Sequence, residues 1–150
     1  MDKPVISDLR DHLGYHRRKI SNAVSYSFAR KFAAREVSIA EWVILREMYS
    51  NKDSLSASQI ATLMGLTRGA ISKLVDNLLN KCLVIRTTAL QDRRYQDIQL
   101  TDKGISLIPE LAAIADDNDA HFFCQLSTEE YAALLIKLAV LHELNADPTE

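Results

Sequence analysis

The feature that most constrains this chain is the segment 67–79, in which apolar and polar side chains separate at helical spacing. At about 100° per residue, one face of the predicted helix consists of Ile71, Leu74, Val75 and Leu78. The opposite face carries Gly69, Ser72, Lys73 and Asp76. We therefore expect one face of this helix to pack against a core and the other to meet solvent or a partner.

The segment before this helix predicts a helix-turn-helix. Ser56 and Gln59 have the spacing of a capping box, which starts a short helix. Gly65 ends that helix, and Thr67 caps the next one. The residues expected on the buried side of the short helix are Ile60, Ala61 and Leu63. Two helices joined by a tight glycine turn form the helix-turn-helix unit.

The segment after it predicts a β-hairpin. Two strand-like runs, 83–88 and 96–100, flank the polar segment 89–95, which contains Arg93 and Arg94. A helix-turn-helix followed by a hairpin with a basic tip is a winged helix.

The flanking segments predict long helices. Ser7 or Asp8 can cap a first helix, whose apolar residues are Leu9, Leu13, Ile20, Val24, Phe28 and Phe32. Capping boxes at 38–41 and 127–130 start a second and a final helix. Thr101 caps the helix between the hairpin and the final one, and Pro109 predicts a kink or a restart near residue 108.

The predicted fold is therefore mainly α with a small β-hairpin wing, in the order of four helices, the hairpin and two further helices. The first and last helices are more apolar than a lone winged helix needs, and the final one carries Leu134, Leu135, Leu138 and Leu141. We expect regions 1–36 and 102–150 to form an intertwined helical dimerisation region. Region 37–101 is then the winged helix-turn-helix domain.

The net charge of −2 conceals an uneven distribution. Residues 1–50 carry nine Lys and Arg against six Asp and Glu, and residues 51–100 carry seven against four. Residues 101–150 carry two against ten. A basic front and an acidic back would orient the protein on a polyanion.

Composition argues against several classes of protein. No window approaches the roughly 20 uninterrupted apolar residues that a membrane span needs. The N-terminus does not resemble a signal peptide, so we expect a cytoplasmic protein that does not bind membranes. Cys82 and Cys124 have no CxxC spacing and are expected to be reduced thiols.

Two histidine patterns in the sequence could form chemical sites. His12 and His16 have an i, i+4 spacing that can hold a metal, but no third ligand is evident, and we expect neither a metal nor a cofactor. His121 and Cys124 share a helical face, but no acid or oxyanion feature accompanies them. We therefore do not expect an enzyme.

Three motifs resemble the MarR-type (multiple antibiotic resistance regulator) bacterial transcription factors. They are the helix-turn-helix register from Gln59 to Thr67, the pattern from Ile71 to Leu78, and Asp92-Arg93-Arg94 followed by Leu100-Thr101-Asp102-Lys103-Gly104. The resemblance spans about residues 8–144 and is strongest from 55 to 105. The family often has glycine where Cys82 stands, so either Cys82 adopts a left-handed conformation or the turn differs.

The resemblance implies an intertwined homodimer that binds double-stranded DNA and represses, or less often activates, nearby operons. In many members a small, frequently aromatic anionic ligand relieves the repression. It also implies that Arg94 enters the minor groove and that Asp92 orients the wing.

The DNA contacts follow from how a helix-turn-helix docks, since the N-terminal half of the second helix supplies contacts in the major groove. The predicted DNA-binding residues are Ser56, Thr67, Arg68, Gly69, Ser72, Lys73, Asn77, Arg86, Asp92, Arg93 and Arg94. Asp76 is discordant, because an outward carboxylate repels phosphate unless paired, and Lys73 is its nearest candidate partner. The plainer interpretation is an ordinary solvated helix face and a charged hairpin tip.

An effector pocket is predicted from an arginine and nearby aromatic residues, which suit an aromatic carboxylate. The candidates are Tyr15, Arg17, Tyr26 and Trp42. These residues could equally belong to the core and the interface. The alternative function is a winged helix used as a protein-interaction or assembly module without specific DNA binding.

Overall fold

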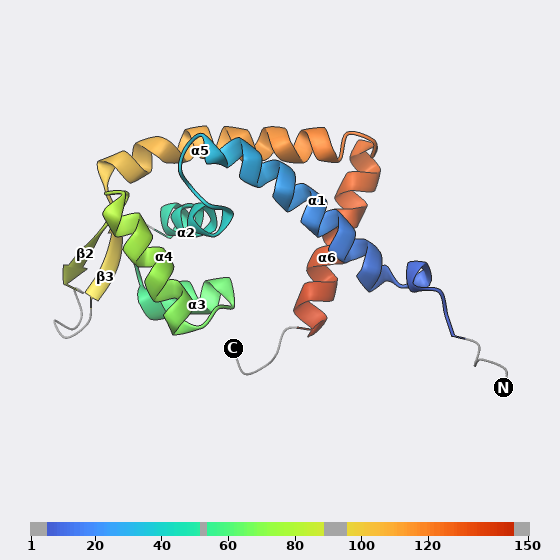
Figure 1. The fold of residues 1–150 in the computed structure, drawn as a ribbon, viewed down its shortest axis with the longest axis horizontal. Coiled ribbons are helices and arrows are strands. Elements are labelled where there is room, and N and C mark those ends of the chain that lie inside the picture. Colours follow the sequence, from blue (N-terminus) through green and yellow to red (C-terminus); the bar gives the residue numbers. More distant parts are fainter. Residues whose placement is uncertain (1–5, 52–53, 89–95, 146–150) are drawn as a thin grey trace.

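The structure is a computed structural model that describes residues 6–51, 54–88 and 96–145. Its elements are η1 (Leu9–Asp11), α1 (Leu13–Ala33), α2 (Ile39–Ser50), β1 (Ser54–Ser56), α3 (Ala57–Met64), α4 (Arg68–Asn80), β2 (Val84–Thr88), β3 (Gln96–Leu100), α5 (Asp102–Phe122) and α6 (Thr128–Asn145). Helices α1 and α5 pack against each other along one side of the molecule (Figure 1). The winged helix lies at one end of this pair and α6 at the other (Figure 1).

The N-terminal helix begins later than the sequence indicated. Asp8 does act as a cap, because its side chain accepts a hydrogen bond from the backbone N–H of Arg10, but it caps the single 3-10 turn η1. The backbone at His12 is extended, and α1 starts at Leu13. A helix starting at Ser7 or Asp8 was therefore wrong by one turn.

The three predicted capping boxes form. In α2 and α3, the hydroxyls of Ser38 and Ser56 accept from the N3 backbone N–H while Glu41 and Gln59 accept from the cap N–H. At the start of α6, Ser127 and Glu130 exchange the same two bonds. Each box satisfies two backbone donors that a helix N-terminus otherwise leaves unpaired.

The wing contains one strand more than predicted. The sheet has three antiparallel strands in the order β1-β3-β2, with Leu55 opposite Ile98 and Val84 opposite Leu100. The extra strand β1 has only three residues and ends at Ser56, the cap of α3, so it is too short for an alternation of apolar and polar residues to be read. The predicted strands at 83–88 and 96–100 are confirmed to within one residue.

One core joins the winged helix to α1 and α5. Its fully buried side chains include Phe32, Leu45, Met48, Leu78 and Leu111. The predicted inner face of α3 was partly wrong, because Ile60 is buried but Leu63 is 51% exposed.

The course of α5 also corrects an expectation. The helix runs unbroken from Asp102 to Phe122 with Pro109 inside it, so the predicted restart near residue 108 does not occur. The first turn of α5 lies close against the backbone at Leu83. At Gly104, a Cβ atom would overlap the carbonyl oxygen of Leu83, so glycine permits this close approach. Across the described ranges, none of the helices is both long and apolar enough to cross a bilayer.

Candidate nucleic-acid interface

Helix α4 has a buried face and a fully open one, as its sequence predicted. Ile71, Val75 and Leu78 are buried. The exposed residues are Arg68, Gly69, Ser72, Lys73, Asp76 and Asn77. The open face carries two cations near its N-terminus, where the helix dipole adds positive potential.

The turn before α4 sets where this face begins. Gly65 has a left-handed backbone with φ of 58°, which ends α3 and which a residue with a Cβ adopts at a cost. The hydroxyl of Thr67 then accepts a hydrogen bond of 3.3 Å from the backbone N–H of Ala70. Thr67 is exposed and Ser56 half-buried, and both serve as helix caps.

Asp76 is neutralised from the wing and not from its own helix. Its carboxylate accepts a hydrogen bond of 2.8 Å from the guanidinium of Arg86 on β2. The expectation that Lys73 is the partner was therefore wrong, because the antiparallel hairpin brings a longer and planar cation against the side of α4. Arg86, which the sequence predicts to be a DNA-binding residue, thus pairs with an acid in the structure.

The exit from α4 is a Schellman turn built on a non-glycine residue. The backbone N–H of Cys82 donates to the carbonyl of Leu79, and that of Leu83 donates to the carbonyl of Leu78. Cys82 takes the left-handed conformation with φ of 57°. The turn thus has the geometry that glycine favours, and Cys82 bears the strain.

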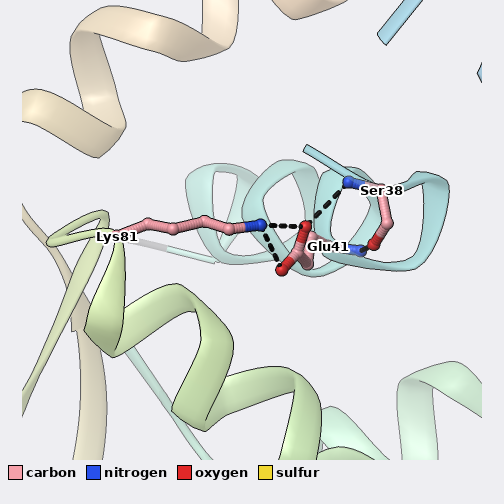
Figure 2. Close-up of polar contacts among 3 residues, drawn as sticks. All are labelled: Ser38, Glu41 and Lys81. Atoms are coloured by element: carbon pink, nitrogen blue, oxygen red, sulfur yellow. Dashed lines mark hydrogen bonds and ion pairs between the residues drawn. The ribbon is translucent and has the colours of Figure 1, made fainter. Parts of the chain in front are cut away.

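A buried ion pair ties this exit to α2. The Lys81 ammonium lies 2.7 Å and 2.8 Å from the two carboxylate oxygens of Glu41, whose side chain is only 2% exposed (Figure 2). Figure 2 shows Lys81 reaching from the end of α4 to the first turn of α2, where Glu41 also accepts from the backbone N–H of Ser38. Burial raises the pKa of Glu41, but Lys81 and the Ser38 N–H outweigh it and hold that pKa below the usual 4.5.

The same exit is held from α5. The Lys103 ammonium donates to the carbonyl oxygen of Lys81 at 2.8 Å. The Thr101 hydroxyl donates to the carbonyl oxygen of Cys82, also at 2.8 Å. No sequence pattern indicated this cluster. Lys81 and Glu41 lie 40 positions apart, and no periodicity relates a residue at a helix exit to the first turn of another helix.

The tip of the wing, with Asp92, Arg93 and Arg94, lies outside the described residues. The described parts of β2 and β3 place residues 88 and 96 opposite each other, at the end of the sheet away from the start of α5.

A cavity of about 850 Å³ lies away from α4, between α1, α2, α5 and the start of α6. Of the four predicted effector residues, only Trp42 lines it. Tyr15 packs edge-on against His16 near the start of α1, Arg17 is exposed, and Tyr26 is 69% exposed beside a shallow depression with Arg30 and Lys31. In a single chain the structure does not bring these four residues together.

The histidines make ordinary polar contacts. His12 lies 3.0 Å from the Ser7 hydroxyl, and His16 lies 2.6 Å from the carbonyl oxygen of Arg10. Within the described parts of the chain, no three His, Cys, Asp or Glu side chains group as metal ligands would.

Comparison with known proteins agrees with this architecture. Residues 35–94 match the MarR family model. The chain is 28% identical to a putative transcriptional regulatory protein for the hcr operon of Thauera aromatica, over 97% of this chain and 92% of that protein.

Solved structures share the fold over nearly the full length. A mutant MarR from E. coli complexed with operator DNA superposes with a TM-score of 0.81 at 18% identity, covering 90% of this chain and 99% of that one. BpsR of Bordetella bronchiseptica, whose DNA binding 6-hydroxynicotinic acid regulates, gives 0.84 at 17% identity, covering 95% and 100%. At these identities the likeness concerns the fold.

Proposed function

Since this chain belongs to the MarR family of winged-helix, DNA-binding transcriptional regulators, we propose that it is a homodimeric repressor that a small aromatic ligand releases from its operator. The family is non-enzymatic. The observation that carries the proposal is the open face of α4, which presents Arg68, Ser72 and Lys73 with no other described element over it.

The proposed docking places the N-terminal half of α4 in the major groove. Arg68 or Lys73 reaches guanine O6 and N7, and Ser72 contacts a base or a phosphate. Thr67, Asn77 and Ser56 flank these contacts. The tip of the wing, with Asp92, Arg93 and Arg94, is proposed to reach the minor groove, where negative potential attracts arginine.

The pairing of Arg86 with Asp76 supports the same docking, because it offsets a carboxylate on the face of α4 that meets DNA. Arg86 then acts in DNA binding by masking repulsion, and it remains close enough to the surface to contact phosphate.

The dimer is proposed to use regions 1–36 and 102–150, which leaves 37–101 as the DNA-binding domain. Support comes from large apolar side chains that remain exposed in the single chain, including Leu13, Ile20, Leu135, Leu138 and Leu141. An exposed apolar surface of this kind marks an interaction site. Two winged helices related by a two-fold axis would read a pseudo-palindrome with half-sites about one helical turn apart.

The effector is proposed to bind the cavity lined by Trp42. It lies between α1 and α5 of the proposed dimerisation region and α2 of the proposed DNA-binding domain, so a ligand there can bias how the two regions sit. The regulation of BpsR by 6-hydroxynicotinic acid is a property of that protein and supports the presence of an effector here.

The decisive measurement is the salt dependence of binding to a fragment of the chain's own promoter, followed by fluorescence anisotropy. Neutralising several phosphates gives a steep negative slope of log K against log salt. Lys73→Ala is expected to weaken binding by about ten-fold and to flatten the slope by about one.

Lys137→Ala is the matched control, because Lys137 lies on α6, which the described contacts do not join to α4. It removes the same charge and is expected to leave affinity unchanged. A flat salt dependence together with equal affinities of both variants would refute the proposed interface.

A further inference from the structure

The cavity beside Trp42 is open to solvent and includes aromatic side chains in its lining. Phe28 comes from α1, Trp42 from α2, and Phe123 from the turn after α5. A volume of about 850 Å³ is within the range of sites for small organic ligands. Aromatic side chains on three sides favour a flat ligand body.

The ionisable groups of this cavity carry one sign of charge. Asp116 and Asp119 on α5 both line it. The residues lining it, all of which the structure describes, include no lysine, arginine or histidine. The nearby cation Lys31 is bonded at 2.6 Å to Asp117, which does not line the cavity. The predicted anion anchor, Arg17, is not among the lining residues either.

The polar contacts available to a ligand are one donor and several carboxylate oxygens. Asn118 is 3% exposed and lines the cavity, and its side-chain oxygen accepts a 2.7 Å hydrogen bond from Ser27. Among residues 6–51, 54–88 and 96–145, its amide nitrogen has no hydrogen-bond partner, although the atom is not sealed from the open space beside it. This donor faces the open space of the cavity and is available to a ligand.

Asp119 is held in place as an acceptor. The hydroxyl of Tyr131 donates to one of its carboxylate oxygens at 2.5 Å, which leaves the other for a ligand. The hydrogen bond to Asp119, together with the negative charge of that carboxylate, raises the pKa of Tyr131 above its ordinary value.

We infer that this cavity takes an uncharged aromatic ligand that carries both a hydrogen-bond acceptor and a donor, such as an aromatic amide, and discriminates against the corresponding carboxylate. The inference rests on the proposed function, which makes this cavity the effector site. The acceptor of the ligand pairs with the Asn118 amide, and its donor with Asp119 or Asp116. A carboxylate would enter beside two like charges without a cation to offset its desolvation.

The test uses matched pairs of probes that differ only in charge. Benzamide against benzoate, and 4-hydroxybenzamide against 4-hydroxybenzoate, are titrated into the full-length protein at neutral pH. Trp42 is the single tryptophan of the chain, so its fluorescence reports occupancy of this cavity directly. Each amide is expected to bind about ten-fold more tightly than its acid, which is a difference of about 1.4 kcal/mol.

Charge variants then assign the discrimination to residues. Asp119→Asn keeps an acceptor for Tyr131 and removes one charge, so it is expected to tighten benzoate binding by roughly three-fold and to change benzamide binding little. Asp117→Asn is the matched control. It removes the same charge two positions away in the sequence, from a residue that pairs with Lys31 and does not line the cavity. It is expected to leave both affinities unchanged.

Two results would overturn the inference. If an acid quenches Trp42 fluorescence at least as tightly as its amide, the cavity remains the effector site and the ligand class is wrong. If neither probe of either pair perturbs Trp42 at millimolar concentration, the assigned class is also wrong. Binding of the operator, measured separately by anisotropy, is independent of both results and tests the proposed function.

Discussion

Cys82 holds a backbone conformation that a side chain makes costly. With φ of 57°, its Cβ atom approaches the neighbouring carbonyl, at a cost of about 1–2 kcal/mol. The two hydrogen bonds of the Schellman turn compensate, because they satisfy the carbonyls of Leu78 and Leu79 that α4 would otherwise leave free. A residue that bears strain in this way marks a place where a single change can stabilise the protein.

Cys82→Gly is therefore expected to raise the free energy of unfolding by about 0.5–1 kcal/mol, since relief of strain exceeds the added entropy of glycine in the unfolded chain. Urea unfolding at fixed protein concentration measures this change in the free energy of unfolding. Cys82→Ala keeps the Cβ atom and is expected to change stability little, since the thiol is exposed. Equal stability of the two variants would argue that the turn is unstrained.

Gly69 has the opposite character, because no contact among the described residues requires a glycine there. It lies within α4, and a Cβ atom there would meet no other atom within 4 Å. In a helix, alanine is more stable than glycine by about 1 kcal/mol. A glycine that destabilises the free protein points to a requirement in the bound state, which is close approach of α4 to the DNA backbone.

Gly69→Ala is expected to raise stability by about 1 kcal/mol and to weaken DNA binding several-fold. Thermal unfolding and anisotropy, measured on the same preparation, separate the two effects. Gly14→Ala in α1 also introduces a methyl group into open space, and it serves as the control that leaves DNA affinity unchanged. Unaltered DNA affinity of Gly69→Ala would remove the argument for close approach.

At the scale of elements, the ion pair between Glu41 and Lys81 fixes α4 relative to α2. Neighbouring Trp42 lines the cavity, so the first turn of α2 contacts both the proposed effector site and the exit of the proposed DNA-reading helix. Glu41 lies in α2 and Lys81 at the exit of α4, and sequence patterns predict these two helices independently of each other. A change in the cavity that rotates α2 would move Glu41 and hence Lys81.

Lys81→Met is expected to destabilise the fold by about 3 kcal/mol at neutral pH, because it leaves the buried Glu41 carboxylate unpaired. Adding Glu41→Gln removes that charge and is expected to recover a large part of the loss. Lys73→Met on the exposed face of α4 is the control and is expected to change stability by less than about 0.5 kcal/mol. A double variant as unstable as the sum of its parts would contradict this coupling.

The pH dependence follows from the lowered pKa of Glu41. A carboxyl whose folded pKa lies below its unfolded value of 4.5 contributes stability above about pH 4.5, and this contribution is lost as pH falls through the folded value. In Lys81→Met, burial acts without the compensating ammonium and raises that pKa. The stability gap between the wild type and this variant is therefore expected to narrow as pH falls, which urea titrations from neutral to acidic pH measure. A gap that stays constant would assign the loss to packing alone.

At the scale of the whole molecule, helix α6 exposes apolar side chains all around its circumference. Leu134, Leu135, Ile136, Val140 and Leu141 are all exposed in the single chain, although they point in different directions around the helix. A helix that is hydrophobic around its circumference is stable only when it is covered. The structure describes few contacts between α6 and the rest of its own chain, so a second copy is the proposed cover.

Leu138→Glu, at a residue 50% exposed in the single chain, is expected to convert the dimer to a monomer at micromolar concentration and to weaken operator binding by more than about ten-fold. The loss arises because two linked winged helices bind one duplex more tightly than one does. Light scattering and anisotropy measure the two quantities. Tyr49→Glu makes a similar change at a residue 46% exposed on α2, outside the proposed dimerisation region, and is expected to leave the dimer intact. A monomeric variant that keeps full affinity would contradict bivalent docking.

The sequence by itself determined the features that depend on residues close together along the chain. Capping boxes, the Gly65 turn and the two faces of α4 arise from spacings of three to four residues, so local rules suffice to predict them. The family resemblance depended on motifs of the same length. Some local features were still predicted wrongly, namely η1, the three-residue β1 and the uninterrupted helix at Pro109, because short-range signals fix the ends and interruptions of elements poorly.

Only the tertiary structure decided which charges meet. Arg86 reaches Asp76 because the hairpin folds back against α4, and Lys81 reaches Glu41 because the exit of α4 lies beside the first turn of α2. It also decided that Asn118, Asp119 and Trp42, rather than Arg17, surround one cavity. These contacts depend on packing between elements far apart in sequence, and no spacing along the chain encodes them. The open face of α4 thus follows from the sequence, and the means by which it is held and neutralised follows from the fold.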